Sequence, residues 1–138
     1  MDRHQLQQLA ELRLADAEAL LASGRWAAAY YLLGYCVECA LKACVAKQFR
    51  SDVVPDRKLV NSFYTHRLDE LLTISGTKSE FEMRAQSDPN FEENWSTIGQ
   101  WNEAARYDPL ITEALAREMR EAVTNTTSGI LPWLKTQW

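Results

Sequence analysis

The fold of this chain is decided by residues 25–49, which have the sequence RWAAAYYLLGYCVECALKACVAKQF. Alanine, leucine, cysteine and aromatic residues occupy almost every side of the helix that this stretch predicts. A helix that is apolar all round lies in a protein core or spans a membrane. Glu38 and Lys42 interrupt the stretch and leave it too short for a span of ~20 uncharged residues, so we predict the central helix of a bundle.

A first helix is predicted over residues 4–22. Its apolar side chains recur at helical spacing. They are Leu6, Ala10, Leu14, Ala17 and Leu21. Gly24 then ends the pattern, because glycine readily adopts the left-handed conformation that follows many helices. Pro55 and several charges predict a surface loop over residues 51–64.

Three later helices are predicted from residues that favour helix starts. The start signals are Thr65, Asp88-Pro89 and Asp108-Pro109. Threonine and aspartate cap helices through their side-chain oxygens, and proline fits the first turn. Gly129 and Pro132 are expected to end or kink the last helix.

The composition is that of a small globular protein. With 138 residues, 46% of them hydrophobic, and only 5 Gly and 4 Pro, the chain can bury one core and favours helix. We therefore expect a single all-α domain over residues 1–138, folded as an up-and-down bundle of four to five helices.

The charge limits the classes of ligand. A net charge of −4 excludes a globally basic nucleic-acid-binding surface, although a local patch is compatible with it. Acidic residues concentrate between Ser79 and Asp108. That stretch should repel a phosphate backbone, except near Arg106.

Three cysteines, Cys36, Cys39 and Cys44, lie within one predicted helix. The first two form a C-x-x-C pair, but no second pair or suitably spaced histidine completes a zinc site. Reduced core thiols are the preferred interpretation, and we expect neither a metal nor a cofactor. Residues 1–9 lack the apolar segment of a secretion signal, so a cytoplasmic protein without a membrane anchor is expected.

Four polar-tipped side chains share one face of the central helix, because they are spaced four, three and four residues apart. They are Tyr31, Tyr35, Glu38 and Lys42. One interpretation is a Glu38–Lys42 pair that stabilises an exposed helix edge. The other is a carboxylate and an ammonium that line a cleft, which could lie at a subunit interface.

Two further candidate sites lie outside the central helix. His66 follows the predicted N-cap Thr65, where a neutral imidazole could act as a general base or simply donate a hydrogen bond. Arg106 and Tyr107 could hold a phosphate and stack on a base, or Arg106 could complement the C-terminal end of a helix. Because a buried charge needs a partner, we expect Arg106 to meet Glu38 in a cleft with His66 at its mouth.

Several segments resemble, in the same order, the HEPN family (higher eukaryotes and prokaryotes nucleotide-binding). They are GRWAAAY at 24–30, VECALKA at 37–43, THRLDELL at 65–72, ARYD at 105–108 and ILPWL at 130–134. The resemblance implies an up-and-down helical bundle, usually dimeric. It also implies a role in RNA cleavage, in toxin–antitoxin pairs, in antiviral defence or beside a nucleotidyltransferase.

Active members of that family use an arginine followed, after four to six residues, by a histidine. Here the positions that follow Arg106 hold Ile111, Thr112 and Glu113, and Asn125 follows Arg120. Asparagine cannot act as a general acid or base near neutral pH. The family's RNase chemistry is therefore not expected of this chain.

We interpret the chain as a dimeric, catalytically degenerate HEPN module of a toxin–antitoxin or defence system. It would bind a nucleotide, RNA or a protein partner through Glu38, Lys42, His66, Arg106 and Tyr107. A homodimer is also favoured because the central helix is too apolar for one small bundle to bury. A first alternative is an RNase toxin in which His66 replaces the missing histidine. A second is an accessory subunit of a nucleotidyltransferase, so an antitoxin or a nucleotidyltransferase is a candidate partner.

Overall fold

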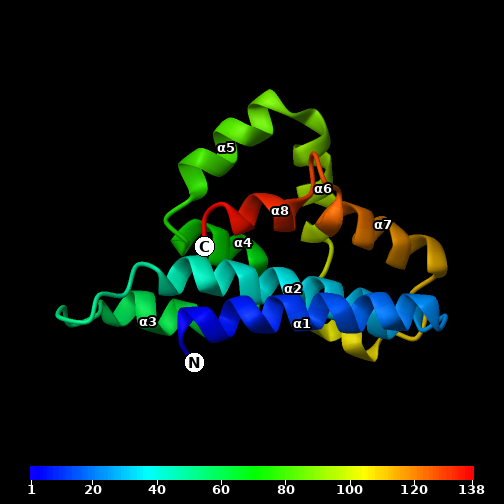
Figure 1. Ribbon diagram of the computed structural model, residues 1–138, viewed down its shortest axis with the longest axis horizontal. Coiled ribbons are helices and arrows are strands. Elements are labelled where there is room, and N and C mark those ends of the chain that lie inside the picture. The colour runs from blue at the N-terminus through cyan, green and yellow to red at the C-terminus, as the bar shows by residue number, and fades with distance from the viewer.

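A computed structural model describes residues 1–138 as eight α-helices and one short 3-10 helix, without strands (Figure 1). In chain order they are α1 (Arg3–Ala22), α2 (Trp26–Ala46), α3 (Arg57–Phe63), α4 (Leu68–Ile74), α5 (Lys78–Ser87), α6 (Pro89–Gly99), the 3-10 helix η1 (Glu103–Tyr107), α7 (Glu113–Thr124) and α8 (Ile130–Lys135). The all-helical fold expected from the sequence is confirmed, but there are more helices than the four to five predicted.

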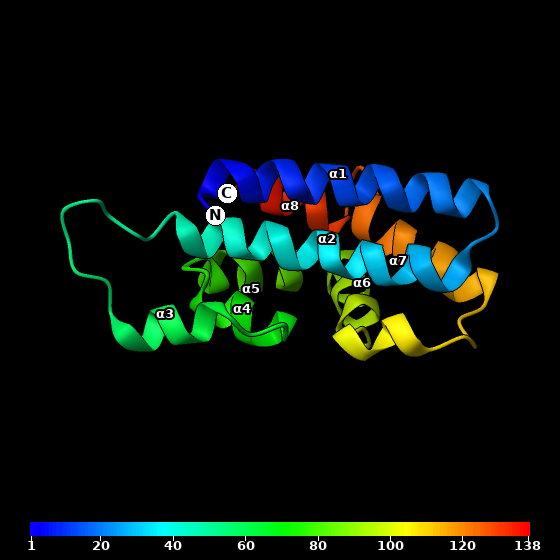
Figure 2. The ribbon, with the colours of Figure 1, turned by 90° about the horizontal axis from the view of Figure 1, so that it is seen from below.

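The two longest helices, α1 and α2, lie side by side and antiparallel (Figures 1 and 2). A capping box starts α1, in which Asp2 accepts the Gln5 N–H and the Gln5 side chain accepts the Asp2 N–H. Gly24 makes the turn into α2 with a φ of +72°, a conformation that other residues rarely adopt. These local signals explain why both helices begin and end within a few residues of their predicted bounds.

Helix α2 forms the centre of the core. Thirteen of its 21 residues are buried, and α1, α4, η1, α7 and α8 all contact it. By length and composition α2 could cross a membrane, so its length does not exclude a span, contrary to our expectation. Two thirds of its apolar stretch is nevertheless covered by the rest of the chain, as in the core helix of a soluble protein.

The covering of α2 also removes one argument for a dimer. Apart from Ala28, which is exposed, every residue of this helix is buried or half-buried. Most of the apolar surface that we expected one small bundle to leave uncovered is therefore covered within a single chain.

An aromatic cluster joins α5, α6 and α8. Phe81 contacts Phe91, Trp95 and Trp133 with ring centroids 5.0 to 5.4 Å apart.

The start of α6 is as predicted, since Asp88 accepts the backbone N–H groups of Asn90 and Phe91 and Pro89 occupies the first turn.

The predicted helix start at Asp108-Pro109 is wrong. Asp108 accepts the Leu110 N–H at 2.9 Å and so closes a turn instead of capping a helix. Helix α7 begins only at Glu113, where the Thr112 hydroxyl accepts the Leu115 N–H.

Three further differences concern short helices. Thr65 lies two residues before the N-cap Arg67 and accepts its N–H, so it forms a turn rather than a cap. Helix α3 lies inside the predicted loop, and α5 was not predicted. Helix α3 buries no residue and α5 buries only Phe81, so neither has the repeated apolar positions that indicate a helix. Gly129 is the N-cap of α8 and Pro132 lies in its first turn, so both residues start a helix rather than end one.

Candidate functional site

The candidate site is built on the polar face of α2. The Glu38 carboxylate is only 2% exposed, and the Lys42 ammonium lies 3.4 Å from it. Lys42 also lies over the ring of Phe63 from α3, at 5.3 Å from the centroid. The Glu38–Lys42 pair therefore exists, but it is buried beneath other elements rather than lying on an exposed helix edge.

His66 approaches this pair from the segment before α4. Its Nδ1 lies 3.0 Å from Oε1 of Glu38, and its Nε2 lies 3.5 Å from Oε2 of Glu103. The imidazole and the Glu103 side chain are each 52% exposed. The Thr65 hydroxyl fixes the backbone next to His66, because it accepts the Arg67 N–H and donates to Glu70. His66 thus joins a buried carboxylate on α2 to an exposed one on η1.

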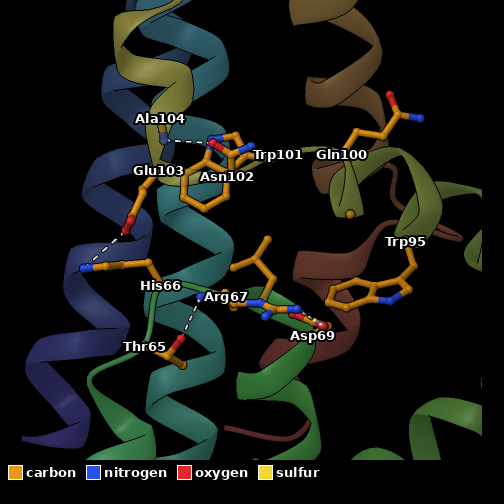
Figure 3. Close-up of a pocket in the computed structure, with 12 residues that line it drawn as sticks. Thr65, His66, Arg67, Asp69, Trp95, Gln100, Trp101, Asn102, Glu103 and Ala104 are labelled. Carbon is orange, nitrogen blue, oxygen red and sulfur yellow. Dashed lines mark hydrogen bonds and ion pairs between the residues drawn. The ribbon is translucent and has the colours of Figure 1, made fainter.

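A hollow of about 760 Å³ opens beside His66, between α4 and the segment that leads into η1 (Figure 3). Its lining residues are Thr65, His66, Arg67, Leu68, Asp69, Trp95, Gly99, Gln100, Trp101, Asn102, Glu103 and Ala104. Binding sites for small molecules are commonly 300 to ~1,000 Å³ in volume, so the hollow has the size of a ligand site.

Trp101 packs on the Tyr31 end of the polar face of α2. Its indole stacks on Tyr31 at 6.0 Å, and Tyr31 stacks on Tyr35 at 6.3 Å. Trp101 also packs directly on Gly34, where a Cβ atom would lie 2.1 to 2.2 Å from the indole ring. The tyrosines of the predicted stripe therefore hold an aromatic side chain of the hollow in place.

Arg106 and Tyr107 lie apart from this cluster. The Arg106 guanidinium stacks on the Tyr107 ring at 4.7 Å, and Arg106 forms no ion pair with Glu38 or any other carboxylate. Glu103, three residues earlier on η1, meets His66 instead. Arg106 does not meet Glu38 as expected, because α6 ends at Gly99. Arg106 therefore lies at the end of η1 and not at the end of a long helix.

Sequence reasoning therefore brought Glu38, Lys42 and His66 together but missed Glu103. One local signal for η1 was present, since Asn102 precedes Glu103 and its side chain accepts the Ala104 N–H at 2.9 Å. That signal marks the start of a short helix. It does not indicate that the helix lies against α2.

A family model described as HEPN domain matches residues 4–137, which is almost the whole chain. The chain belongs to the HEPN family. Neither the curated proteins nor the solved structures contain a significant match to this HEPN domain.

The positions that would carry the family's arginine–histidine motif have structural roles in this HEPN domain. Arg120 donates to both carboxylate oxygens of Glu18 on α1, at 2.7 and 2.9 Å. The Asn125 side chain donates to Glu121 and accepts the backbone N–H groups of Thr127 and Ser128. Both side chains are therefore occupied in joining α7 to its neighbours.

The cysteines of this HEPN domain are buried and form no disulfide. Burial raises the pKa of the Cys36 thiol to about 12 and the pKa values of Cys39 and Cys44 to about 11. Thiols with such pKa values stay protonated near neutral pH, and the thiolate is the form that attacks or binds metal. This favours a packing role for the C-x-x-C pair.

Proposed function

We propose that this HEPN domain is a nucleotide- or RNA-binding module without the family's RNase chemistry, and that its ligand lies in the hollow beside His66. The observation that carries the proposal is the fixed position of His66 at the mouth of this hollow. Buried Glu38 holds the Nδ1 side of the ring, so the Nε2 edge faces outward, toward Glu103 and a ligand.

Arg106 and Tyr107 supply the second part of the proposed interface. They lie on the same five-residue helix as Glu103, and both are exposed. Arg106 has no carboxylate partner, so its guanidinium is free to bind a phosphate outside the hollow, with Tyr107 available for stacking. An RNA strand would then extend from the hollow across η1.

A second candidate function is supported by the contact between Glu38 and His66. A buried carboxylate that holds one ring nitrogen fixes the tautomer and orientation of a histidine, and this arrangement activates the other nitrogen as a general base. His66 would then replace the missing motif histidine in an RNase toxin. This candidate differs from the first only in whether bound RNA is cleaved.

The cellular setting that we propose is a toxin–antitoxin or defence system of the cytoplasm, where the buried cysteines would stay reduced. The proposed partners are a second copy of the chain and an antitoxin or nucleotidyltransferase. The HEPN family membership supports this setting.

The test is fluorescence anisotropy with a labelled single-stranded RNA of mixed sequence, together with a gel of the same RNA after incubation. We expect Arg106→Ala to weaken binding several-fold and to lower the slope of log affinity against log salt by about 1. Arg3→Ala is the matched control, because it removes an exposed arginine from the N-terminal end of α1. This variant should bind RNA as the unaltered chain does.

The outcomes separate the two candidates. Intact RNA supports a binding module, whereas cleavage that disappears in the His66→Ala variant supports the RNase. If the unaltered chain binds no RNA and no mononucleotide, the proposed function is wrong. Circular dichroism of each variant shows whether the helices are retained.

A further inference from the structure

The 3-10 helix η1 is held to the rest of the bundle by few contacts. None of its five residues is buried, and Ala105, which packs against the core, is only half-buried. The backbone bonds from Ala105 to Asn102 and from Asp108 to Ala105 are local. Beyond residues 102–108, the one polar contact of η1 is the approach of Glu103 to His66 (Figure 3). A segment that buries so little surface opens at a low cost in free energy, so a single ion pair can shift its position.

The contact between Glu103 and His66 depends on the charge of the imidazole. The Glu38 carboxylate can only accept, so the hydrogen of a neutral His66 ring lies on Nδ1. The lone pair on Nε2 then faces Oε2 of Glu103, 3.5 Å away, and two acceptors repel each other. A protonated ring carries a hydrogen on each nitrogen and can donate to both carboxylates. The contact is therefore favourable only when His66 is charged.

The other charged groups near this contact have partners of their own. The charged groups on the surrounding elements are Glu38 and Lys42 on α2, Arg67, Asp69 and Glu70 at the start of α4, and Glu103 and Arg106 on η1. Lys42 pairs with Glu38 at 3.4 Å, and Arg67 pairs with both acidic residues of α4. Arg106 lies over the Tyr107 ring. Glu103 is thus the one carboxylate in the group whose only cationic partner is His66.

We propose that η1 is a pH-dependent lid on the polar face of α2, held closed by protonated His66 and released when the imidazole loses its charge. Imidazoles change charge between about pH 5 and pH 8, whereas glutamate side chains are largely ionised above about pH 5. The closed form therefore gains population as the pH falls through this range. Release frees the Nε2 lone pair at the mouth of the hollow. The effect on a ligand rests on the proposed function, but the movement of the lid does not.

Nuclear magnetic resonance of the full chain tests the lid without any nucleotide. The measurements at about pH 5.5 and about pH 8 are the proton contacts between the His66 ring and the Glu103 side chain, and the backbone 1H–15N NOE of residues 103–107. We expect the ratio of closed to open lid to be about two- to five-fold lower at the higher pH, the effect of an exposed ion pair. Both the proton contacts and the backbone NOE should then weaken.

Two variants remove the pH dependence by different routes. The amide of Glu103→Gln can accept from a charged ring and donate to Nε2 of a neutral ring, so η1 should stay closed at both pH values. His66→Gln removes the group that changes charge, so the backbone NOE of η1 should be the same at both pH values.

The matched controls are Glu82→Gln, at an exposed position on α5, and His4→Gln, which removes the other histidine of the chain, exposed on α1. Both should keep the pH dependence of η1. Circular dichroism checks that every variant keeps its helices.

Three results would overturn the lid. They are equal contacts of His66 with Glu103 at both pH values, stronger contacts at the higher pH, and a pH dependence that persists in either Glu103→Gln or His66→Gln. RNA binding is measured separately, so the two ideas fail separately. A pH-dependent lid on a chain that binds no RNA contradicts the proposed function alone, and RNA binding with a pH-independent η1 contradicts the lid alone.

Discussion

At the scale of single residues, the contact between Gly34 and Trp101 determines whether the site can form. Trp101 is 5% exposed, and its indole N–H is buried without a hydrogen-bond partner. The position of the ring therefore depends on packing against α2 and not on hydrogen bonding. Only a residue without a Cβ atom allows this close approach.

We predict that Gly34→Ala lowers the free energy of unfolding by about 1–3 kcal/mol, because the added methyl group overlaps the Trp101 indole in a packed core. The matched control is Gly99→Ala, at the end of α6, where no heavy atom lies within 4 Å of the added Cβ. That control should be neutral or slightly stabilising, since alanine favours helix. Urea unfolding of both variants measures the difference, and equal midpoints would contradict the proposed contact.

The same contact shows how far the site could be predicted from the sequence. Glu38 and Lys42 share a face by spacing alone, so their pairing was available before any fold was known. The contacts of Glu103 with His66 and of Trp101 with Gly34 join segments far apart in the chain, and no local pattern specifies such contacts. Arg106 was misplaced for the same reason, because its neighbours depend on where η1 packs.

At the scale of elements, Asp88 connects three parts of the bundle. Besides capping α6, its carboxylate accepts the Ser128 hydroxyl at 2.8 Å and pairs with Arg84 of α5 at 3.2 Å. Arg84 also donates to the Thr127 carbonyl, in the segment between α7 and α8. Hydrogen bonds from Ser128, Phe91 and Arg84 lower the pKa of Asp88.

A pKa that is lower in the folded state means that the folded chain binds fewer protons than the unfolded chain. The contribution of Asp88 to stability is therefore complete above its unfolded pKa, about 3.9, and is lost as the pH falls through the lower folded value. We predict that Asp88→Asn lowers the urea midpoint at pH 7 and that the difference from the unaltered chain narrows below about pH 4. Asparagine can still cap α6, so the change reports on the charge.

Asp52→Asn is the control for this prediction, because Asp52 is exposed in the segment between α2 and α3 and has no ion-pair partner. It should leave the midpoint unchanged over the same pH range. A difference for Asp88→Asn that stays constant from pH 7 to pH 3 would show that the carboxylate charge is not responsible.

The elements themselves were predictable to different degrees. The two long helices, α1 with its capping box and the apolar α2, are specified by their side-chain patterns and by the turn at Gly24. Short helices such as α3 bury almost nothing and carry no periodic signal. Of the two Asp-Pro pairs, Asp88-Pro89 starts a helix and Asp108-Pro109 does not. An aspartate side chain can accept backbone N–H groups in a turn as well as at a helix N-cap.

At the scale of the whole molecule, a homodimer stays a prediction that rests on the HEPN family, since most of α2 is covered within one chain. We expect light scattering at micromolar concentration to give twice the chain mass of 15.8 kDa. A mass of 15.8 kDa alone at every concentration measured would exclude the dimer. The same experiment on Gly34→Ala would show whether damage near the site affects association.

The position of α8 in the core has a consequence for biosynthesis. Leu131, Trp133 and Leu134 of this helix are buried against the rest of the bundle, and Lys135 pairs with Glu11 of α1. A ribosome releases α8 after every other helix, so α1 and α2 can meet while the chain is still being translated but their apolar surfaces cannot be fully covered. During that interval the nascent chain presents the kind of surface that chaperones recognise.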